Sequence, residues 1–327
     1  SPREWILKAL LQNRDMALKE TERVGFWSDM LLHYREVNND LPTTNTTIFD
    51  WHYRPEVSPD SAIFFKNEGF EVIASPALVC YPHMLLPDDC NYTNIRRFTQ
   101  IAREQDLKGV NTTIWIPTRY MSDVLWTGIA YSASHAWAGG NWNEQDFFTA
   151  FMRDHFGSDR GEQYQKTSAK LTSIIWHRDD FYTSCWADEE SLENAQQMVK
   201  EKGEEIRRKI QELDQILEEL NSIGTSVKKN KVDWRAMERS AWILRYTMEH
   251  LLAASTVREG EQWNVEKVRE LDKKCRQAIE WIEEDWDKNR YADDPNKEGL
   301  YLTYQHLLHR ILKMHQYHQK IVESGEG

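Results

Sequence analysis

The chain has 327 residues, enough for about two domains with substantial cores. Hydrophobic residues make up 40% of the sequence, which argues against wholesale disorder. The formal net charge is −12, and no basic stripe is present to neutralise phosphates, so we expect neither nucleic acid nor an anionic membrane surface as a partner. No apolar run is long enough to predict a membrane span.

The first region, residues 1–157, alternates helical and strand-like patterns. Short runs rich in β-branched and aromatic residues predict four strands, over 23–27, 46–51, 70–75 and 110–115. Apolar residues at helical spacing predict helices over 3–22, 59–68, 91–107 and 122–138. This α/β pattern predicts parallel βαβ units.

The near-equal length of the four repeats favours a (β/α)₈ TIM barrel over a doubly wound sheet, and no Gly-rich dinucleotide motif follows any of the strands. A complete barrel needs eight strands and about 250 residues. The four βα units therefore predict the second half of a barrel. Either the N-terminal half lies upstream or a partner chain completes the fold.

The second region, residues 158–327, shows no strand-like alternation. Apolar residues that recur every three or four positions predict an all-α domain, with helices over 204–220, 233–255, 264–286 and 297–320. Asp233 is the expected N-cap of the second of these helices. Four helices with short connections predict an antiparallel helical bundle that packs within one molecule.

Four cysteines and a group of histidines are the candidate metal ligands of the sequence. No CxxC pair occurs, so we expect no structural zinc site and free thiols, although Cys80 and Cys90 could bridge if their loop folds back. The histidines near the C-terminus have no acidic or cysteine ligand among them, and we interpret them as a solvated helix face: His306, His309, His315 and His318. We therefore expect no metal and no cofactor.

The fourteen tryptophans are unusually many, and three of them stand at predicted strand ends. Trp27, Trp51 and Trp115 end the first, second and fourth strands. In a barrel, the carboxyl ends of the strands face the substrate. An indole ring suits stacking on the C–H face of a sugar, so we interpret the three rings as a pocket wall. The alternative is that they simply fill the core.

Polar residues accompany these tryptophans. Asp29 could bind a sugar hydroxyl or serve as a structural carboxylate, and these two roles stay open. Strand alternation points Asp50 and His52 away from Trp51 and Tyr53, which favours a structural role for the first two. Tyr81 and His83, in the loop after the third strand, are weaker candidates for contact with substrate.

The strand ends resemble a known family. WSDM at 27–30, DWHY at 50–53 and GVNTTIW at 109–115 resemble the later strands of glycoside hydrolase family 20, the β-N-acetylhexosaminidases. The resemblance covers roughly residues 1–140, and a long helical domain after the barrel is similar to that of some bacterial members. It implies a substrate-assisted retaining mechanism, in which the 2-acetamido oxygen of the substrate attacks the anomeric carbon.

The resemblance also implies roles for individual residues. Trp27, Trp51 and Trp115 would form a box around the N-acetyl methyl group, and Tyr53 would donate its hydroxyl hydrogen to the acetamido oxygen. The substrate-binding set is completed by Asp29. The expected ligand is a glycan that ends in N-acetylglucosamine or N-acetylgalactosamine.

The chain departs from the family at two places. The catalytic Asp-Glu pair of the family has no counterpart here, because the one such dipeptide, Asp188-Glu189, lies in the helical region and is typical of a helix start. Pro117 stands where the family commonly has an acidic residue. We therefore expect no catalytic residue in this chain, an acid/base pair upstream of it, and no activity of the chain alone.

Two classes of function follow from these patterns. The first is part of a glycosidase that removes terminal N-acetylhexosamine. The second is a non-catalytic sugar-binding or scaffolding protein on a degenerate barrel, whose helical domain is a protein-interaction module.

Overall fold

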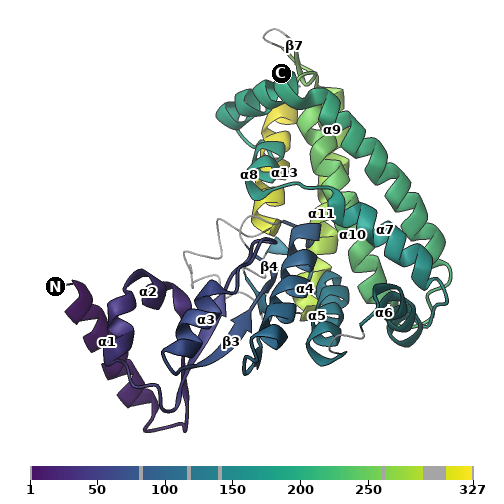
Figure 1. The fold of residues 1–327 in the computed structure, drawn as a ribbon. Helices are drawn as coiled ribbons and strands as arrows, with labels where there is room; N and C mark the ends of the chain where they lie inside the picture. Colours follow the sequence, from purple (N-terminus) through teal and green to yellow (C-terminus); the bar gives the residue numbers. More distant parts are fainter. Residues whose placement is uncertain are drawn as a thin grey trace. The chain divides into compact units, whose positions relative to one another are not determined.

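The computed structural model describes residues 2–80, 84–115, 119–138, 142–259, 262–289 and 307–325. The chain divides into two compact units. One comprises Ser1–Cys80, Cys90–Trp115 and Gly128–Trp142, and the other Tyr81–Asp89, Ile116–Thr127 and Asn143–Gly327. The first contains a parallel sheet with helices and the second is largely helical (Figure 1). We call them the α/β unit and the helical unit.

Four parallel strands form the main sheet of the α/β unit, which confirms the predicted parallel βα pattern. Their spatial order is their order in the chain: β1 (Val24–Trp27), β2 (Thr46–Trp51), β3 (Glu71–Ser75) and β5 (Gly109–Val110). In the register of the sheet, Trp27 pairs with Phe49 and Trp51 pairs with Ser75. A separate parallel pair is formed by β4 (Ala77–Val79) and β6 (Thr113–Ile114).

The prediction of one continuous strand over 110–115 is wrong. The chain forms β5 and β6 instead, which pair with β3 and β4 respectively. Pro76 lies between β3 and β4 and has no N–H to donate, so the ladder is interrupted there. On either side of the break, the Asn111 N–H donates to the Ala74 carbonyl and the Thr113 N–H to the Pro76 carbonyl, both at 2.8 Å.

Four helices of the α/β unit correspond to predicted ones, although the first ends at Ala17 and not at residue 22, and two short helices between the first two strands were not predicted. The helices of the unit are α1 (Pro2–Ala17), α2 (Ser28–His33), the 3₁₀ helix η1 (Arg35–Asp40), α3 (Asp60–Asn67), α4 (Asp89–Glu104) and α5 (Trp126–Ala138), of which residues 128–138 belong to this unit. The chain leaves α3 at Gly69, which has a φ of 90° and donates its N–H to the Lys66 carbonyl. The helix predicted over 122–138 begins as the 3₁₀ helix η3 (Ser122–Leu125).

One face of the main sheet carries the core of the α/β unit. Ile48 of β2 and Val72 of β3 belong to a buried cluster with Phe65 of α3. Ala74 of β3 belongs to a second cluster with Phe98 of α4. Because side chains alternate along a strand, the neighbouring residues of β2 and β3 point to the opposite face, away from these helices.

The helical unit contains seven described α-helices and a short antiparallel β-pair. The helices are α6 (Glu144–Phe151), α7 (Gly161–Ser173), α8 (Arg178–Ser184), α9 (Glu189–Gly224), α10 (Lys231–Ala253), α11 (Val265–Asn289) and α13 (Leu307–Gly325). A π-helical turn, η5 (Met152–Phe156), follows α6, and β7 (Arg258–Glu259) pairs with β8 (Gln262–Trp263). Helix α9 packs on α7 and α10, and α11 packs on α10 and α13.

Two helix starts of the helical unit differ from the expected ones, and a third is not described. The helix predicted over 204–220 begins at Glu189, and Asp188 caps it, which confirms Asp188-Glu189 as a helix start. Asp233 as an N-cap is wrong, because α10 begins one turn earlier and Asn230 is its cap residue. Of the helix predicted over 297–320, residues 297–306 lie outside the described part of the chain.

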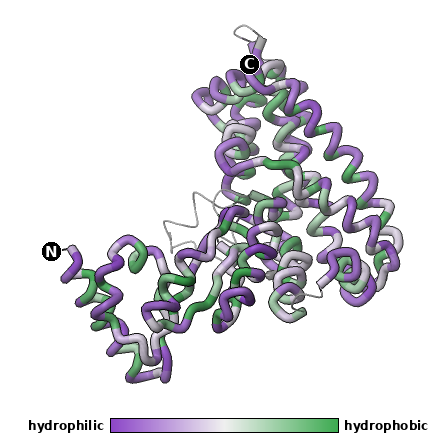
Figure 2. Tube along the Cα trace, viewed as in Figure 1, coloured by the Kyte–Doolittle hydropathy of each residue, from purple (hydrophilic) through white to green (hydrophobic). Residues whose placement is uncertain are grey.

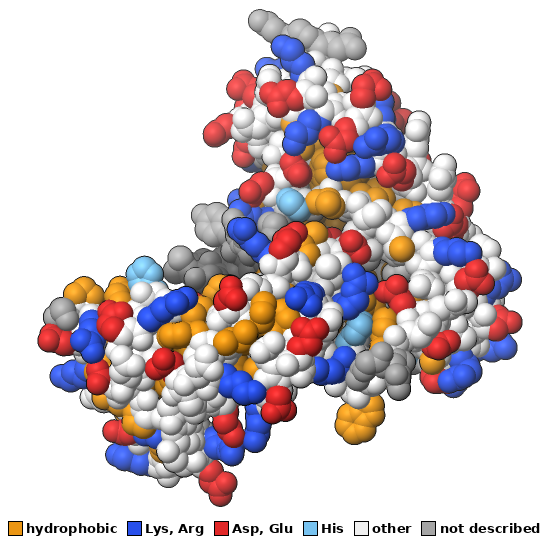
Figure 3. Space-filling model, viewed as in Figure 1, with side chains coloured by type: hydrophobic (Ala, Val, Ile, Leu, Met, Phe, Trp, Pro, Cys, Tyr) orange, Lys and Arg blue, Asp and Glu red, His pale blue; other side chains and the backbone are white. Residues whose placement is uncertain are grey.

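Charge and hydropathy are finely mixed on the helical unit. Hydrophobic residues recur along the largely hydrophilic trace of α9 (Figure 2), and acidic and basic side chains are interspersed over the surface in view (Figure 3). Pairs such as Lys209–Glu205 at 2.9 Å account for this mixing along α9. No helix among the described residues is long and apolar enough to cross a membrane.

The cap of α9 provides a test of this helix boundary. The Asp188 carboxylate accepts the Ser191 N–H at 2.7 Å, and the Ser191 hydroxyl accepts the Asp188 N–H at 3.0 Å. We expect Asp188→Ala to lower the free energy of unfolding of the helical unit by about 1 kcal/mol. Urea denaturation followed by circular dichroism measures this loss. Glu193→Ala, an exposed change in the same helix, is the matched control, and equal losses in the two variants would contradict the cap.

Candidate functional site: an aromatic cluster at the strand ends

The predicted substrate-binding residues lie together at the carboxyl ends of the strands. Trp27 ends β1, Trp51 ends β2, Tyr53 follows two residues later, Trp115 follows β6, and Asp29 lies in the first turn of α2. The ring centroids of Trp51 and Tyr53 are 4.8 Å apart, those of Trp27 and Trp115 6.0 Å, and those of Tyr53 and Trp115 6.4 Å. We call the four rings the aromatic cluster.

A hydrogen bond at the centre of the aromatic cluster sets the role of Tyr53. The Trp115 Nε1–H donates to the Tyr53 hydroxyl oxygen at 2.5 Å. An indole N–H can only donate, so the Tyr53 oxygen is the acceptor of this bond. The Tyr53 hydroxyl also interacts with Thr113, whose own hydroxyl hydrogen goes to the Pro76 carbonyl at 3.1 Å. At the edge of the cluster, Trp51 Nε1 lies 3.5 Å from Asp29 Oδ1, and the Trp51 backbone N–H donates to the Ser28 hydroxyl at 3.2 Å.

The aromatic cluster is open to solvent at two of its rings. Trp27 is 41% exposed and Trp115 is 40% exposed, whereas Tyr53 is half-buried. Burial raises the pKa of Tyr53 above its ordinary value, although its hydrogen bonds with Thr113 and Trp115 act in the opposite direction. Tyr53 therefore stays protonated at neutral pH and can serve as a hydrogen-bond donor beside an exposed apolar surface.

Two residues that support the aromatic cluster were not predicted from the sequence. The ring of Phe49 lies 5.4 Å from that of Trp27. Gly25 makes room for it, because a Cβ at Gly25 would lie 2.3 Å from the Phe49 ring. The available signal was the alternation of Phe49, Trp51 and Tyr53, which places three aromatic rings on one side of the same segment.

Asp50 and His52 lie away from the cluster, as strand alternation predicts. Asp50 is fully buried and accepts the Ser61 hydroxyl hydrogen at 2.7 Å. His52 Nε2 lies 2.7 Å from the Ser61 oxygen and 3.2 Å from Asp50 Oδ1. Because the Ser61 hydrogen points to Asp50 and not to His52, this trio is not an activated nucleophile. It fastens α3 to β2.

The remaining candidates from the sequence have different outcomes. Tyr81, His83 and Pro117 lie outside the described residues. The interpretation of the C-terminal histidines as a solvated face is wrong for His318, which is fully buried because α13 packs on α11. All four cysteines are free thiols, and within the described ranges no group of three or more His, Cys, Asp or Glu residues could hold a metal ion.

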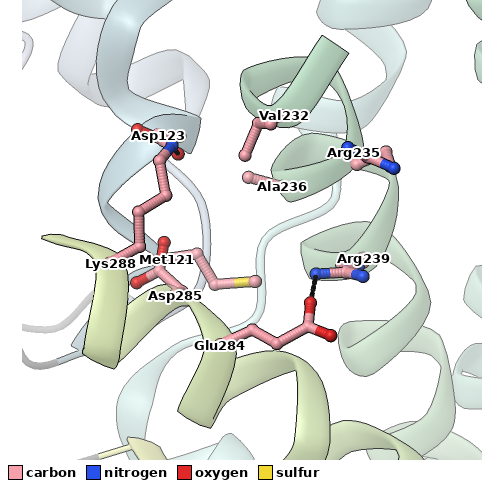
Figure 4. Close-up of a pocket in the computed structure, with 9 residues that line it drawn as sticks. All are labelled: Met121, Asp123, Val232, Arg235, Ala236, Arg239, Glu284, Asp285 and Lys288. Atoms are coloured by element: carbon pink, nitrogen blue, oxygen red, sulfur yellow. Dashed lines mark hydrogen bonds and ion pairs between the residues drawn. The ribbon is translucent and has the colours of Figure 1, made fainter.

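A cavity of about 360 Å³ lies in the helical unit, between η3, α10 and α11 (Figure 4). Figure 4 shows the apolar side chains of Met121, Val232 and Ala236 between its charged walls. Most of the charged groups are already paired: Lys288 with Asp123 at 2.7 Å, Arg239 with Glu284 at 2.6 Å, and Asp285 with the Ser122 N–H at 3.0 Å. Because these charges are paired, the cavity presents little net electrostatic field to a ligand. The aromatic cluster is therefore the stronger candidate for a binding site.

The chain matches no model of a known protein family and no curated protein. The chemistry of the strand ends is therefore what points to a function.

Replacing each of the two aspartates at the strand ends with alanine should change the free energy of unfolding by a different amount. Asp50→Ala leaves the buried Ser61 hydroxyl without its acceptor and removes the neighbour of His52, so we expect it to lower the free energy of unfolding by about 1–3 kcal/mol. Asp29 is exposed, and we expect Asp29→Ala to change that free energy by less than about 0.5 kcal/mol. Urea denaturation of both variants measures this, and an equal loss in Asp29→Ala would assign Asp29 a structural role.

Proposed function

We propose that the aromatic cluster binds the terminal N-acetylhexosamine of a glycan, as part of the active site of a glycoside hydrolase. The supporting observation is the Tyr53 hydroxyl, which Trp115 holds between the tryptophan rings. An acetamido group presents a carbonyl oxygen next to a methyl group. It needs one hydrogen-bond donor beside an apolar wall, and Tyr53 with the rings of Trp27, Trp51 and Trp115 supplies both.

The architecture of the α/β unit supports a barrel as the setting for this site. The strands are neighbours in the order in which they occur in the chain, whereas a doubly wound sheet reverses its order at a switch point. In the described part of the unit, α3 and α4 pack on the same face of the sheet, as the outer helices of a barrel do. We therefore propose that the sheet is the second half of a (β/α)₈ barrel.

The proposed reaction is substrate-assisted hydrolysis with retention. The acetamido oxygen must approach the anomeric carbon to about 3 Å, and a box that holds the methyl group and a donor that orients the carbonyl supply this alignment. Asp188-Glu189 does not supply the acid in this proposal, because the Asp188 carboxylate caps α9 and the Glu189 carboxylate pairs with Arg258 and accepts the Tyr317 hydroxyl hydrogen. The general acid of the proposal comes from a barrel strand that these 327 residues do not include.

Binding of the monosaccharide tests the proposal directly. We expect isothermal titration to show that the chain binds N-acetylglucosamine or N-acetylgalactosamine more tightly than glucose. Trp115→Ala removes one wall and the donor to Tyr53, so we expect the Kd to rise roughly tenfold, equal to about 1.4 kcal/mol.

The matched control is Trp137→Ala, because Trp137 is also in the α/β unit, is 94% exposed and has no ring contact with the aromatic cluster. Its Kd should equal that of the unmodified chain. Absence of binding, or equal affinity for glucose and the N-acetyl sugars, would refute an acetamido-binding site.

A hydrolysis assay distinguishes a glycosidase from a non-catalytic sugar-binding protein. We expect the 327-residue chain to bind a chromogenic N-acetylhexosaminide without hydrolysing it, because the aromatic cluster orients the nucleophile but provides no acid. Hydrolysis should appear when strands that end in an Asp-Glu pair complete the barrel, and Tyr53→Phe should then reduce kcat. A completed barrel that binds the sugar and still fails to hydrolyse it would favour the non-catalytic sugar-binding protein.

A further inference from the structure

Two connections that follow strands of the α/β unit are built into the helical unit. The segment after β4, Tyr81–Asp89, and the segment after β6, Ile116–Thr127, both belong to the helical unit. The chain therefore passes between the two units five times, after residues 80, 89, 115, 127 and 142. The helical unit is thus part of the way in which the strands are connected, and not only a domain that follows them.

The described residues of these two connections are mostly buried. The Leu85 N–H donates to the Arg119 carbonyl at 3.1 Å, so the two connections bond to each other. The 3₁₀ helix η3, which lies in the second connection, packs on α10 and α11. The buried apolar residues of the two connections are Met84, Leu85, Tyr120, Met121, Val124 and Leu125.

Two side chains of α11 fasten η3 at its start. The Ser122 N–H donates to the Asp285 carboxylate, with N···O distances of 3.0 and 3.1 Å. The first N–H groups of a helix have no partner within that helix, so Asp285 acts as a cap of η3. Lys288 of α11 reaches the buried Asp123 carboxylate at 2.7 Å (Figure 4). Because an unpaired buried carboxylate is costly, this ion pair also keeps η3 on α11.

The position of η3 determines where α5 begins, and α5 packs on β4. Helix α5 follows η3 directly, and its second residue, Thr127, shares a hydrogen bond of 2.7 Å with the Tyr164 hydroxyl of α7. The next residue, Gly128, lies against Leu78 of β4, because a Cβ at Gly128 would be 2.2 Å from the Leu78 side chain. A shift of η3 would therefore move the backbone that supports β4.

The ladder of β4 and β6 is short and carries one ring of the aromatic cluster at its end. Only Ala77 with Thr113 and Val79 with Ile114 are paired, and the Trp115 N–H adds one bond to the Val79 carbonyl at 3.0 Å. An isolated two-stranded ladder of this kind is marginally stable in water. Both of its strands continue at their carboxyl ends into the connections that the helical unit holds.

We propose that the helical unit keeps the β4–β6 ladder in place through η3, and that Asp285 and Lys288 on α11 are thereby positioning residues for Trp115. They act through η3, α5 and Leu78, and not by contact with the rings. The consequence for sugar binding rests on the proposed function, whereas the consequence for Trp115 does not.

NMR of the full chain with nitrogen-15-labelled tryptophan tests the proposal. The Trp115 Nε1–H donates to Tyr53, so its signal, identified by its loss in Trp115→Phe, reports on the position of the ring. Asp285→Ala removes the cap of η3. We expect the Trp115 signal to shift and its indole hydrogen to exchange with solvent roughly tenfold faster, because the ladder opens more easily. The Kd for N-acetylglucosamine should rise roughly threefold.

Asp285→Asn and Asp188→Ala are the matched controls. The asparagine side chain still offers an oxygen to the Ser122 N–H, so Asp285→Asn should keep the Trp115 signal of the unmodified chain. Asp188→Ala also destabilises the helical unit, but at the cap of α9, and it should leave the Trp115 signal unchanged. An effect on Trp115 that is specific to Asp285→Ala therefore separates positioning from a general loss of stability.

A Trp115 signal that is unchanged in folded Asp285→Ala, or that moves as far in Asp188→Ala, would overturn the proposal. If Asp285→Ala does not fold, Lys288→Ala decides in the same way, because it changes a half-exposed side chain and leaves Asp123 without its cation. A Trp115 signal that responds as expected in a chain that binds no sugar would refute the proposed function and leave the positioning role intact.

Discussion

The alternation of side chains along the parallel strands is the constraint on which the α/β unit depends. In β2, Ile48 and Asp50 point to the helices, while Phe49 and Trp51 point to the opposite face. A slip of one residue would bury the aromatic rings under α3 and would move the Asp50 carboxylate away from its Ser61 donor. The same alternation therefore holds the helices on one face and presents the aromatic cluster on the other.

This constraint explains which parts of the α/β unit could be predicted from the sequence. The strands and the placement of Trp27, Trp51 and Tyr53 follow from local patterns with a period of two. The break between β5 and β6 does not, because it depends on Pro76 in a neighbouring strand that is distant in the sequence. The contact of Phe49 with Gly25 likewise required the register between two strands, which no local pattern shows.

The helical unit was harder to predict in detail for a related reason. Helical spacing identifies an apolar face, but it does not say where a helix begins when two cap residues compete. Asn230, in a left-handed conformation, begins α10, and Asp233 turns instead to His155 at 2.9 Å. His318 looked solvent-exposed because its partners, His250 and Asp272, lie on two other helices, and only their packing brings the three side chains together.

The two units differ in whether their polar and aromatic groups are buried against one another or open to solvent. This difference distinguishes a structural network from a candidate binding site. In the helical unit, the Ser184 carbonyl bonds to His250, His250 bonds to His318, and the Asp272 carboxylate bonds to His315 and Gln319, so these polar groups serve the packing of the helices. In the α/β unit, the Tyr53 hydroxyl bonds with Trp115 and Thr113 in the aromatic cluster, and two large rings stay open to solvent. An exposed apolar wall beside a hydroxyl group is typical of a binding site, because a ligand with a polar and an apolar group can contact both.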